Sequence, residues 1–380
     1  MNLFQNFQSF FLTIILLFPF VNCQNIPNPR YQQTSSLIGN RLYFFGGNIS
    51  PIVNNNDNAD NITNEIWYLD LSGSFNTATP PWNKDVGMPI GYVFSASCVS
   101  PIDNSAFLVG GRIFIPNTAN INLGSSPVYV FNSNISLWTT PNIIGKIYTF
   151  GGTNYTYSNV PSGSYNDMSI LNTTSMTWYT LPISANTPLP YFDYTATLLP
   201  NGIIVYIGGY KSTPPGSADQ YEAVSMNEIQ TFNTINYSWS TKNGSGASIG
   251  TRIYHSAVLT QYGEIIIYGG SLLNDTLTSA TPYIAKLDTS SWMWSIPNVS
   301  QINSPQLSYH SATLYRDYMI IAFGNYYIML LWFYNHSNND LFIGLGIGAG
   351  IILLGVFSVV GFLLYKRKNK NQFIPTPGTY

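Results

Sequence analysis

Ile265-Ile266-Ile267-Tyr268-Gly269-Gly270 is the stretch of this 380-residue sequence that decides the fold. A short apolar run predicts a β-strand, and the glycine pair that ends it predicts a turn packed too closely for a Cβ atom. The pattern recurs at Leu42–Gly47, Phe107–Gly111, Ile147–Gly152 and Ile204–Gly209, with a degenerate copy at Met319–Asn325. The paired glycines are Gly46/Gly47, Gly110/Gly111, Gly151/Gly152, Gly208/Gly209 and Gly269/Gly270. Such self-similarity indicates a repeat architecture.

A second marker follows each glycine pair. In four repeats it stands at a fixed distance before a tryptophan. A hydrophobic residue and an Asn or Asp stand seven and six residues before Trp138, Trp178, Trp239 and Trp294. The first repeat has Leu69-Asp70 and a longer insert before Trp82. The Asn or Asp predicts a turn between strands, and the Trp predicts a bulky side chain that fills the space between adjacent sheets.

A third element precedes most glycine pairs and is rich in Ser and Ala. It is present at Tyr254–Val258 and Tyr309–Thr313, and Phe94–Ala96 and Tyr194–Ala196 align with it. Small residues suit a crowded inner strand near a central axis. In this alignment His255 and His310 occupy one equivalent position, which Phe94 and Tyr194 take in other repeats.

The order Gly-Gly, hydrophobic-Asn/Asp, Trp resembles the kelch repeat over roughly residues 30–335. The resemblance implies an all-β, kelch-type β-propeller, in which four-stranded sheets stack around an axis and bury one another. Six copies imply six blades. The chain resembles fungal membrane-anchored kelch proteins and is distantly similar to the galactose oxidase propeller domain.

Two repeats depart from the regular spacing. The distance from Trp82 to Gly110 is 28 residues, that from Trp138 to Gly151 is 13, and the next three such intervals are 30. The third repeat is therefore predicted to lack its innermost strand. The sixth is predicted to stop early, because no spaced Trp follows Gly324. Either the propeller is irregular or coding segments are missing; unpaired backbone in a core favours the second explanation.

The two ends of the chain predict export and a membrane anchor. Phe10–Val21 is too short to span a bilayer and predicts a signal peptide over residues 1–23, with an uncleaved anchor as the alternative. The uncharged run Leu341–Tyr365 predicts a transmembrane helix over 339–365. Four basic residues in the tail 366–380 place the tail in the cytoplasm. Residues 24–338 are then the propeller ectodomain of a single-pass type I protein in the plasma membrane or secretory pathway.

Charge and sequons agree with this location. Charged residues make up only 8% of the chain, and a net charge of −2 argues against a nucleic-acid partner. Ten Asn-x-Ser/Thr sequons lie between the apolar ends, and we expect several to be glycosylated. The candidates are Asn48, Asn61, Asn134, Asn154, Asn172, Asn236, Asn243, Asn274, Asn298 and Asn335.

No residue pattern predicts a catalytic, cofactor or metal site. A copper-radical site like that of galactose oxidase would need two His, two Tyr and a Cys, but His336 is juxtamembrane and His255 and His310 fit structural positions. Cys98 is expected to be a buried thiol without a disulfide partner. The carboxylates of Asp193, Asp219, Glu222, Glu264 and Asp275 show no spacing that predicts a catalytic pair.

Binding through loops is therefore the predicted function. The segments after the glycine pairs are long, polar and expected on one face of the propeller, where recognition usually resides. They are Asn48–Asn64, Arg112–Pro127, Thr153–Tyr165, Tyr210–Ser225 and Ser271–Thr281. We expect a non-enzymatic module that binds an extracellular or lumenal protein or glycan, with a copper-radical oxidoreductase as the alternative. Gly344/Gly348 and Gly346/Gly350 also predict a homodimer through the membrane helix.

Overall fold

The structure is a computed structural model. It describes residues 26–49, 61–75, 80–114, 128–139, 145–155, 161–213, 220–272, 278–298, 305–324, 330–335 and 340–345. The predicted signal peptide and tail lie outside these residues, as does most of the predicted transmembrane helix. Among the described residues, no helix is long and apolar enough to cross a membrane.

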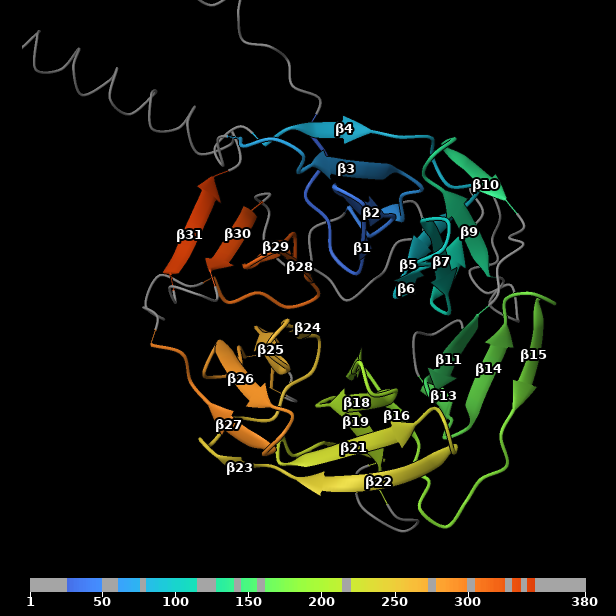
Figure 1. The fold of residues 1–380 in the computed structure, drawn as a ribbon, viewed down its shortest axis with the longest axis vertical. Helices are drawn as coiled ribbons and strands as arrows, with labels where there is room; N and C mark the ends of the chain where they lie inside the picture. Colours follow the sequence, from blue (N-terminus) through green and yellow to red (C-terminus); the bar gives the residue numbers. More distant parts are fainter. Residues whose placement is uncertain are drawn as a thin grey trace, which may run out of the picture.

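The described residues form six main sheets that stand around a common axis as a β-propeller (Figure 1). We number them in chain order and give their strands from the axis outward. The first comprises β1 (Thr34–Ile38), β2 (Arg41–Phe45), β3 (Ile66–Asp70) and β4 (Trp82–Lys84). The second comprises β6 (Ala96–Val99), β7 (Ser105–Val109), β9 (Tyr129–Asn132) and β10 (Leu137–Thr139). The third comprises β11 (Lys146–Phe150), β14 (Met168–Asn172) and β15 (Thr177–Thr180).

The other three sheets repeat the same order. The fourth comprises β17 (Thr195–Leu198), β18 (Ile203–Ile207), β21 (Glu228–Asn233) and β22 (Ser238–Asn243). The fifth comprises β24 (Ser256–Leu259), β25 (Glu264–Tyr268), β26 (Ile284–Asp288) and β27 (Met293–Ser295), with the short β23 (Ser245–Gly246) parallel to β27. The sixth comprises β28 (Ser311–Tyr315), β29 (Tyr318–Ala322), β30 (Leu330–Asn335) and β31 (Asp340–Leu345).

Parts of the predicted loops form three small sheets on the face where the glycine pairs lie. They are β5 (Gly91–Val93) with β8 (Arg112–Phe114), β12 (Thr153–Tyr155) with β13 (Pro161–Ser164), and β16 (Tyr191–Phe192) with β19 (Tyr210–Ser212) and β20 (Tyr221–Ala223). We call this face of the propeller the loop face. It also carries the starts of the inner strands, because each inner strand runs antiparallel to the strand that ends at a glycine pair.

The prediction that the sixth sheet stops early is wrong. Strand β30 pairs with β29, and β31 pairs with β30. Leu341 stands opposite Tyr334, just as Trp294 stands opposite Leu287. Tyr334 and Asn335 precede Leu341 by seven and six residues, so Leu341 takes the tryptophan position of the repeat. The last strand thus uses residues assigned to the predicted membrane helix, and the propeller extends beyond residue 338.

The third sheet differs from the others as the spacing predicted. Its innermost strand in the structure is β11, which ends at Gly151 and Gly152 and therefore corresponds to the second strand elsewhere. Among the described residues, β11 pairs with β14 on one side and with no strand on the side of the axis. In the part of the chain that the structure describes, the position between β11 and the axis holds no strand.

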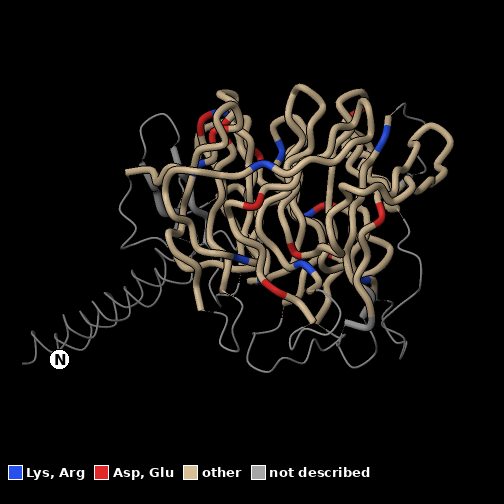
Figure 2. Tube along the Cα trace, turned by 90° about the horizontal axis from the view of Figure 1, so that it is seen from below, with Lys and Arg blue, Asp and Glu red and all other residues tan. Residues whose placement is uncertain are grey.

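The hydrophobic core lies between neighbouring sheets, because each sheet of a propeller buries its faces against the next sheet. Separate clusters join the sixth and first, first and second, third and fourth, fourth and fifth, and fifth and sixth sheets. Between the second and third sheets, the buried cluster of the described residues consists of Phe107, Val109 and Val130 of the second sheet, with Ile147 of β11 packed against it. This cluster is smaller than each of the other five. In the view of Figure 2, the Lys, Arg, Asp and Glu of the described residues are dispersed and not gathered in one stripe.

Candidate functional site

Five residues with left-handed backbone surround the axis at the loop face. Each stands two residues before an inner strand: Gln32, Phe94, Asp193, Tyr254 and Tyr309, with φ of 61°, 58°, 55°, 57° and 57°. Non-glycine residues seldom adopt this conformation, and such residues often occur at functional sites. We call these five residues the axial ring.

The axial ring corrects the predicted alignment by one position. Phe94 is equivalent to Tyr254, and Ser95 is equivalent to His255, because Gly111 and Gly270 pack against Ser95 and His255 respectively. The predicted equivalence of Tyr194 with His255 and His310 is correct in this geometry. The error arose because the sequence does not reveal which residue turns left-handed before the strand.

Aromatic side chains of the axial ring pack together. The rings of Tyr254 and Tyr309 are stacked, with centroids 3.9 Å apart, and Phe94 lies edge-on to Tyr309 at 6.2 Å. The Arg112 guanidinium lies over the Phe94 ring, 5.3 Å from its centroid. Aromatic rings with one cation form a surface suited to recognition.

Asp193 is the acidic member of the axial ring. Burial raises the pKa of Asp193 to about 7, while a hydrogen bond with Tyr254 and the charge of Arg112 act in the opposite direction. A carboxyl group with this pKa exists in both protonation states near neutral pH. Sequence reasoning found no partner for Asp193, because Tyr254 and Arg112 come from other repeats.

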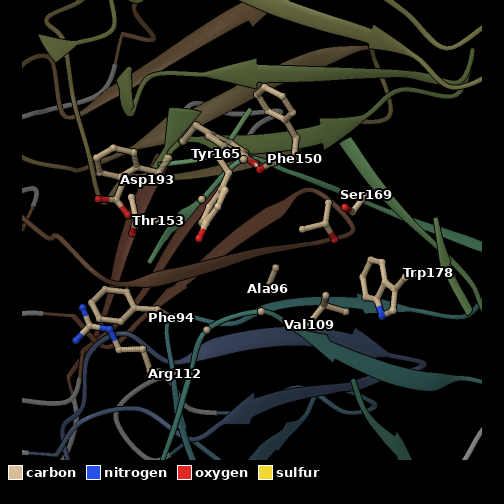
Figure 3. A pocket seen from close by; sticks show the side chains of 17 residues that line it. Phe94, Ala96, Val109, Arg112, Phe150, Thr153, Tyr165, Ser169, Trp178 and Asp193 are labelled. Carbon is tan, nitrogen blue, oxygen red and sulfur yellow. The ribbon is translucent and has the colours of Figure 1, made fainter. Parts of the chain in front are cut away.

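A cavity of about 570 Å³ opens beside the axial ring, between the second and fourth sheets and next to β11. Phe94, Arg112, Asp193, Thr153 and Tyr165 surround one end of it, and Trp178 lies at the other (Figure 3). Ala96 and Val109 of the second sheet form one wall, and Phe150 and Ser169 of the third form another. The cavity occupies the radial position that lacks an inner strand, and ligand pockets have volumes in this range.

The two histidines link inner strands to one another. His310 Nε2 lies 2.7 Å from Ser256 Oγ, and His255 Nε2 lies 3.2 Å from Thr195 Oγ1. Burial lowers the pKa of His310 to about 3 and that of His255 well below its usual value. Gln33 makes the equivalent contact with Ser311. These contacts support the structural interpretation, and the described residues contain no group of three His, Cys, Asp or Glu that could hold a metal ion.

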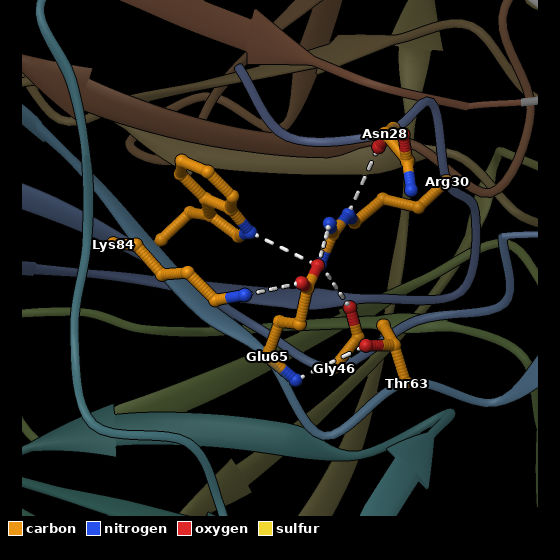
Figure 4. Close-up of polar contacts among 7 residues, drawn as sticks. Asn28, Arg30, Gly46, Thr63, Glu65 and Lys84 are labelled. Carbon is orange, nitrogen blue, oxygen red and sulfur yellow. Dashed lines mark hydrogen bonds and ion pairs between the residues drawn. The ribbon is translucent and has the colours of Figure 1, made fainter. Parts of the chain in front are cut away.

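Two buried arginines, which sequence reasoning missed, fix the glycine-pair turns. Arg30 donates from Nη1 to the Gly46 carbonyl at 3.1 Å, and Arg252 donates from Nη1 to that of Gly269 at 2.9 Å. Glu65 Oε2 lies 2.9 Å from Arg30 Nη2, and its Oε1 lies 2.7 Å from Lys84 Nζ (Figure 4). Burial would raise the pKa of Glu65, but hydrogen bonds from Lys84, Trp67 and Arg30 lower it to about 2. The common spacing, four residues before the inner strand, was the available signal.

The repeat glycines and tryptophans behave as predicted except beside the cavity. A Cβ atom on Gly269 would lie 2.2 Å from the Leu307 carbonyl oxygen, which explains the requirement for glycine. Trp294 is 2% exposed and donates from Nε1 to the Met226 carbonyl at 2.9 Å, whereas Trp178 is 42% exposed. Trp239 is also buried, and Trp138 donates to the Gly87 carbonyl. Trp178 lines the cavity instead of filling a closed interface.

Cys98 is exposed, which contradicts the prediction of a buried thiol. Its neighbour Ser97 forms 2.8 Å hydrogen bonds with Thr34 and Ser36 of the first sheet. Because successive side chains in a strand point to opposite faces, Cys98 points away from the first sheet, toward the side of the missing strand.

The sequons differ in accessibility. The side chains of Asn134, Asn236, Asn243 and Asn298 are exposed, whereas Asn48 is fully buried. Asn61 and Asn172 are half-buried, and the side chains at the remaining three sequons lie outside the described residues. A glycan requires an accessible Asn, so Asn48 is a poor acceptor in the folded protein.

A family model described as the Attractin/LZTR1 β-propeller matches residues 140–330, half of the chain. The chain belongs to this family of β-propellers. This Attractin/LZTR1 propeller of the kelch type is also similar to two further proteins. Acyl-CoA-binding domain-containing protein 5 of Arabidopsis thaliana is 22% identical over 83% of this chain and 46% of its own length. Kelch domain-containing protein 3 of Rattus norvegicus is 29% identical over 44% of this chain and 45% of its own length.

The chain therefore spans less than half the length of these two relatives. The solved structure of YjhT superposes on this kelch propeller with a TM-score of 0.56 and 13% identity, covering 83% of this chain and 98% of YjhT. At that identity the likeness shows the fold alone. Together with the repeat, these comparisons confirm the predicted kelch-type β-propeller.

Proposed function

We propose that this kelch propeller is a non-enzymatic binding module, six-bladed in design, that holds a protein or glycan on its loop face outside the cytoplasm. The axial ring and the adjoining cavity carry the proposal. They combine packed aromatic rings, a guanidinium and a carboxyl group on a rigid scaffold, which is the composition of binding hot spots. Kelch propellers serve as interaction scaffolds, and the loop face offers the site for one.

Capture experiments with the full-length protein test the proposal. Wild-type protein and the double variant Arg112→Ala/Asp193→Ala would be incubated with surface proteins and cell-wall polysaccharides. We expect one partner to be enriched by the wild type and reduced at least about tenfold by the double variant, as loss of hot-spot residues predicts. The control is Arg316→Ala/Asp317→Ala, an adjacent pair in the turn between β28 and β29, which should not change capture. Equal capture by all three proteins would refute the proposed site.

The alternative, a copper-radical oxidoreductase, needs His and Tyr ligands that converge on one ion. His255 and His310 are engaged with Thr195 and Ser256, and this supports the non-enzymatic proposal. Reconstitution with copper distinguishes the oxidoreductase from the binding module. Retention of one copper per chain, with hydrogen peroxide released from sugars or alcohols, would favour the oxidase; copper-free protein that captures a partner would favour the binding module.

A location outside the cytoplasm with a single membrane span is part of the proposal. Export predicts glycans on Asn134, Asn236, Asn243 and Asn298, whose side chains are exposed, and none on the buried Asn48. Mass spectrometry before and after glycosidase treatment measures this pattern. Protein without any glycan would contradict export.

The membrane span would extend from after β31 to Tyr365, since Asp340–Leu345 belongs to the sixth sheet. Gly344 pairs with Leu331 in that sheet, so only Gly346 and Gly350 remain as the proposed contact between two membrane helices. Crosslinking in membranes tests the dimer. Crosslinked dimers that disappear in Gly346→Leu/Gly350→Leu would support it, and monomers alone would remove it.

A further inference from the structure

Among the described residues, one glycine lacks the backbone hydrogen bond that its equivalents make. The N–H groups of Gly47, Gly152, Gly209, Gly270 and Gly324 donate to backbone carbonyls of the next sheet, at 2.8–3.0 Å. The acceptors are Tyr92, Tyr191, Arg252, Leu307 and Arg30, each four residues before an inner strand. Gly111 holds the same position in the second sheet, and its N–H has no backbone acceptor among the described residues. Its expected acceptor would precede the missing inner strand of the third sheet.

Packing around the glycine pairs shows the same vacancy. A Cβ atom on Gly46, Gly151 or Gly269 would lie 2.2–2.3 Å from a carbonyl oxygen of the next sheet. On Gly110, the equivalent glycine of the second sheet, it would meet nothing within 4 Å. A Cβ atom on Gly152 also meets nothing, whereas one on Gly209 would lie 2.5 Å from the Phe192 carbonyl oxygen. Two neighbouring turns therefore keep a shape that fits a backbone segment which is not found among the described residues.

The edge of β11 that faces the axis has no partner strand among the described residues. Its first four residues are exposed or half-buried, whereas the equivalent strands β2, β7, β18, β25 and β29 are buried after their first residue. A strand edge with unpaired N–H and C=O groups is a template for another strand. The cavity runs along this edge, from the axial ring to Trp178.

We propose that the cavity binds an extended peptide from a second polypeptide, which pairs antiparallel with β11 and completes the third sheet. The five other sheets specify its register. The first residue of each inner strand stands opposite the last residue of the second strand, as Ser311 stands opposite Ala322. A bound peptide would place that residue opposite Phe150, and the carbonyl four residues earlier would accept from the Gly111 N–H.

The inner strands of this chain also specify the chemistry of the peptide. They begin Thr-Ser, Ala-Ser, Thr-Ala, Ser-Ala and Ser-Ala, so the peptide carries small residues where it enters the sheet. The residue two positions before its strand would join the axial ring between Phe94 and Asp193. The inference deepens the proposed function and rests on it, because it names an extended peptide as the partner bound at the loop face.

A peptide with the sequence of residues 307–315, Leu-Ser-Tyr-His-Ser-Ala-Thr-Leu-Tyr, provides the probe. Fluorescence anisotropy would measure its binding to the full-length protein. Two versions, N-methylated at alternate residues of the strand, remove the donors on one edge or on the other. We expect one version to bind at least about tenfold more weakly and the other to bind like the parent, because only one edge faces β11. Absence of binding by the parent, or equal binding by all three peptides, would overturn the proposal.

Protein variants test the location. Ala96 lines the cavity, so Ala96→Trp should weaken peptide binding at least about tenfold, whereas Ile102→Trp, at a site 67% exposed and outside the cavity lining, should leave it unchanged. A copy of residues 185–201 inserted between Ile144 and Gly145 lengthens the interval from Trp138 to the glycine pair from 13 to 30 residues. This insertion should abolish peptide binding and raise the Tm. Unchanged binding in both Ala96→Trp and the insertion variant would overturn the proposal.

The outcomes also separate this inference from the proposed function. If Arg112→Ala/Asp193→Ala abolishes partner capture but N-methylation and insertion have no effect, the loop face binds a partner and the strand pairing is refuted. If the parent peptide binds but capture of a natural partner does not depend on Arg112 and Asp193, the cavity accepts a strand and the proposed loop-face function fails.

Discussion

The hydroxyl of Tyr194 donates a hydrogen bond to the carbonyl oxygen of Phe150, the last residue of β11. At the equivalent position in the sixth sheet, His310 contacts Ser256 at the start of the neighbouring inner strand. Among the described residues, no inner strand of the third sheet lies beside Tyr194, and its longer side chain reaches the last residue of β11 instead. One buried carbonyl at the open edge is thereby satisfied within the chain.

Tyr194→Phe should lower the free energy of unfolding by about 1 kcal/mol, because it removes one hydrogen bond and leaves the Phe150 carbonyl without this donor. Urea denaturation measures the change. Tyr318→Phe, at an exposed position on β29, is the matched control and should change stability by less than about 0.5 kcal/mol. Equal effects of the two substitutions would contradict the role of Tyr194.

The repeat tryptophans should differ in their contribution to stability. Trp294 is 2% exposed and Trp178 is 42% exposed, although both follow the same sequence marker. Trp294→Ala should cost about 3–5 kcal/mol, as expected for a large buried aromatic side chain. Trp178→Ala should cost less, about 1 kcal/mol, since a large part of this side chain already faces solvent. A similar loss in both variants would show that the interface at Trp178 is closed.

Arg252 should stabilise the fold through the planar arrangement of its guanidinium N–H donors rather than through its charge. It donates to the carbonyls of Gly250, Gly269 and Pro282 at 3.2, 2.9 and 2.9 Å. Arg252→Lys keeps the charge but not the planar geometry, and should destabilise the protein by about 2–4 kcal/mol. The control Arg316→Lys, at an exposed site, should be nearly neutral. A neutral result at position 252 would refute the proposed fixation of the turn.

Asp193 should make stability depend on pH. Its pKa is raised to about 7 in the folded protein, compared with about 3.9 in an unfolded chain. The folded state therefore binds the proton more tightly, and the contribution of Asp193 to stability falls as the pH rises from about 4 to about 7. The Tm of Asp193→Asn relative to the wild type should increase between pH 5 and pH 8. A Tm difference independent of pH would contradict the raised pKa.

Regular spacing made much of the fold predictable. Gly269 and Gly270 are required by local backbone geometry and close approach, and Trp294 by the interface between sheets, so both leave a periodic signal in the sequence. The missing inner strand was predictable for the same reason, because the interval from Trp138 to Gly151 is short. Strand β31 was not, because Leu341 replaces the tryptophan and its apolar sequence is equally typical of a membrane span.

The candidate site was less predictable, because its contacts join distant repeats. Asp193, Tyr254 and Arg112 are brought together only by closure of the ring of sheets. The left-handed conformation of Phe94 has no local signature such as glycine, which led to the one-residue error in alignment. Arg30 and Arg252 bind backbone carbonyls. Every residue has a carbonyl, so the sequence does not show which residues accept these hydrogen bonds.

Hydrogen–deuterium exchange at β11 tests most directly the claim that its open edge is the binding site. The amides among Lys146–Phe150 that point toward the axis should exchange faster than those of the equivalent strand β18, and partner or peptide binding should protect them. Exchange as slow as in β18 without a partner, or no added protection with one, would contradict the account.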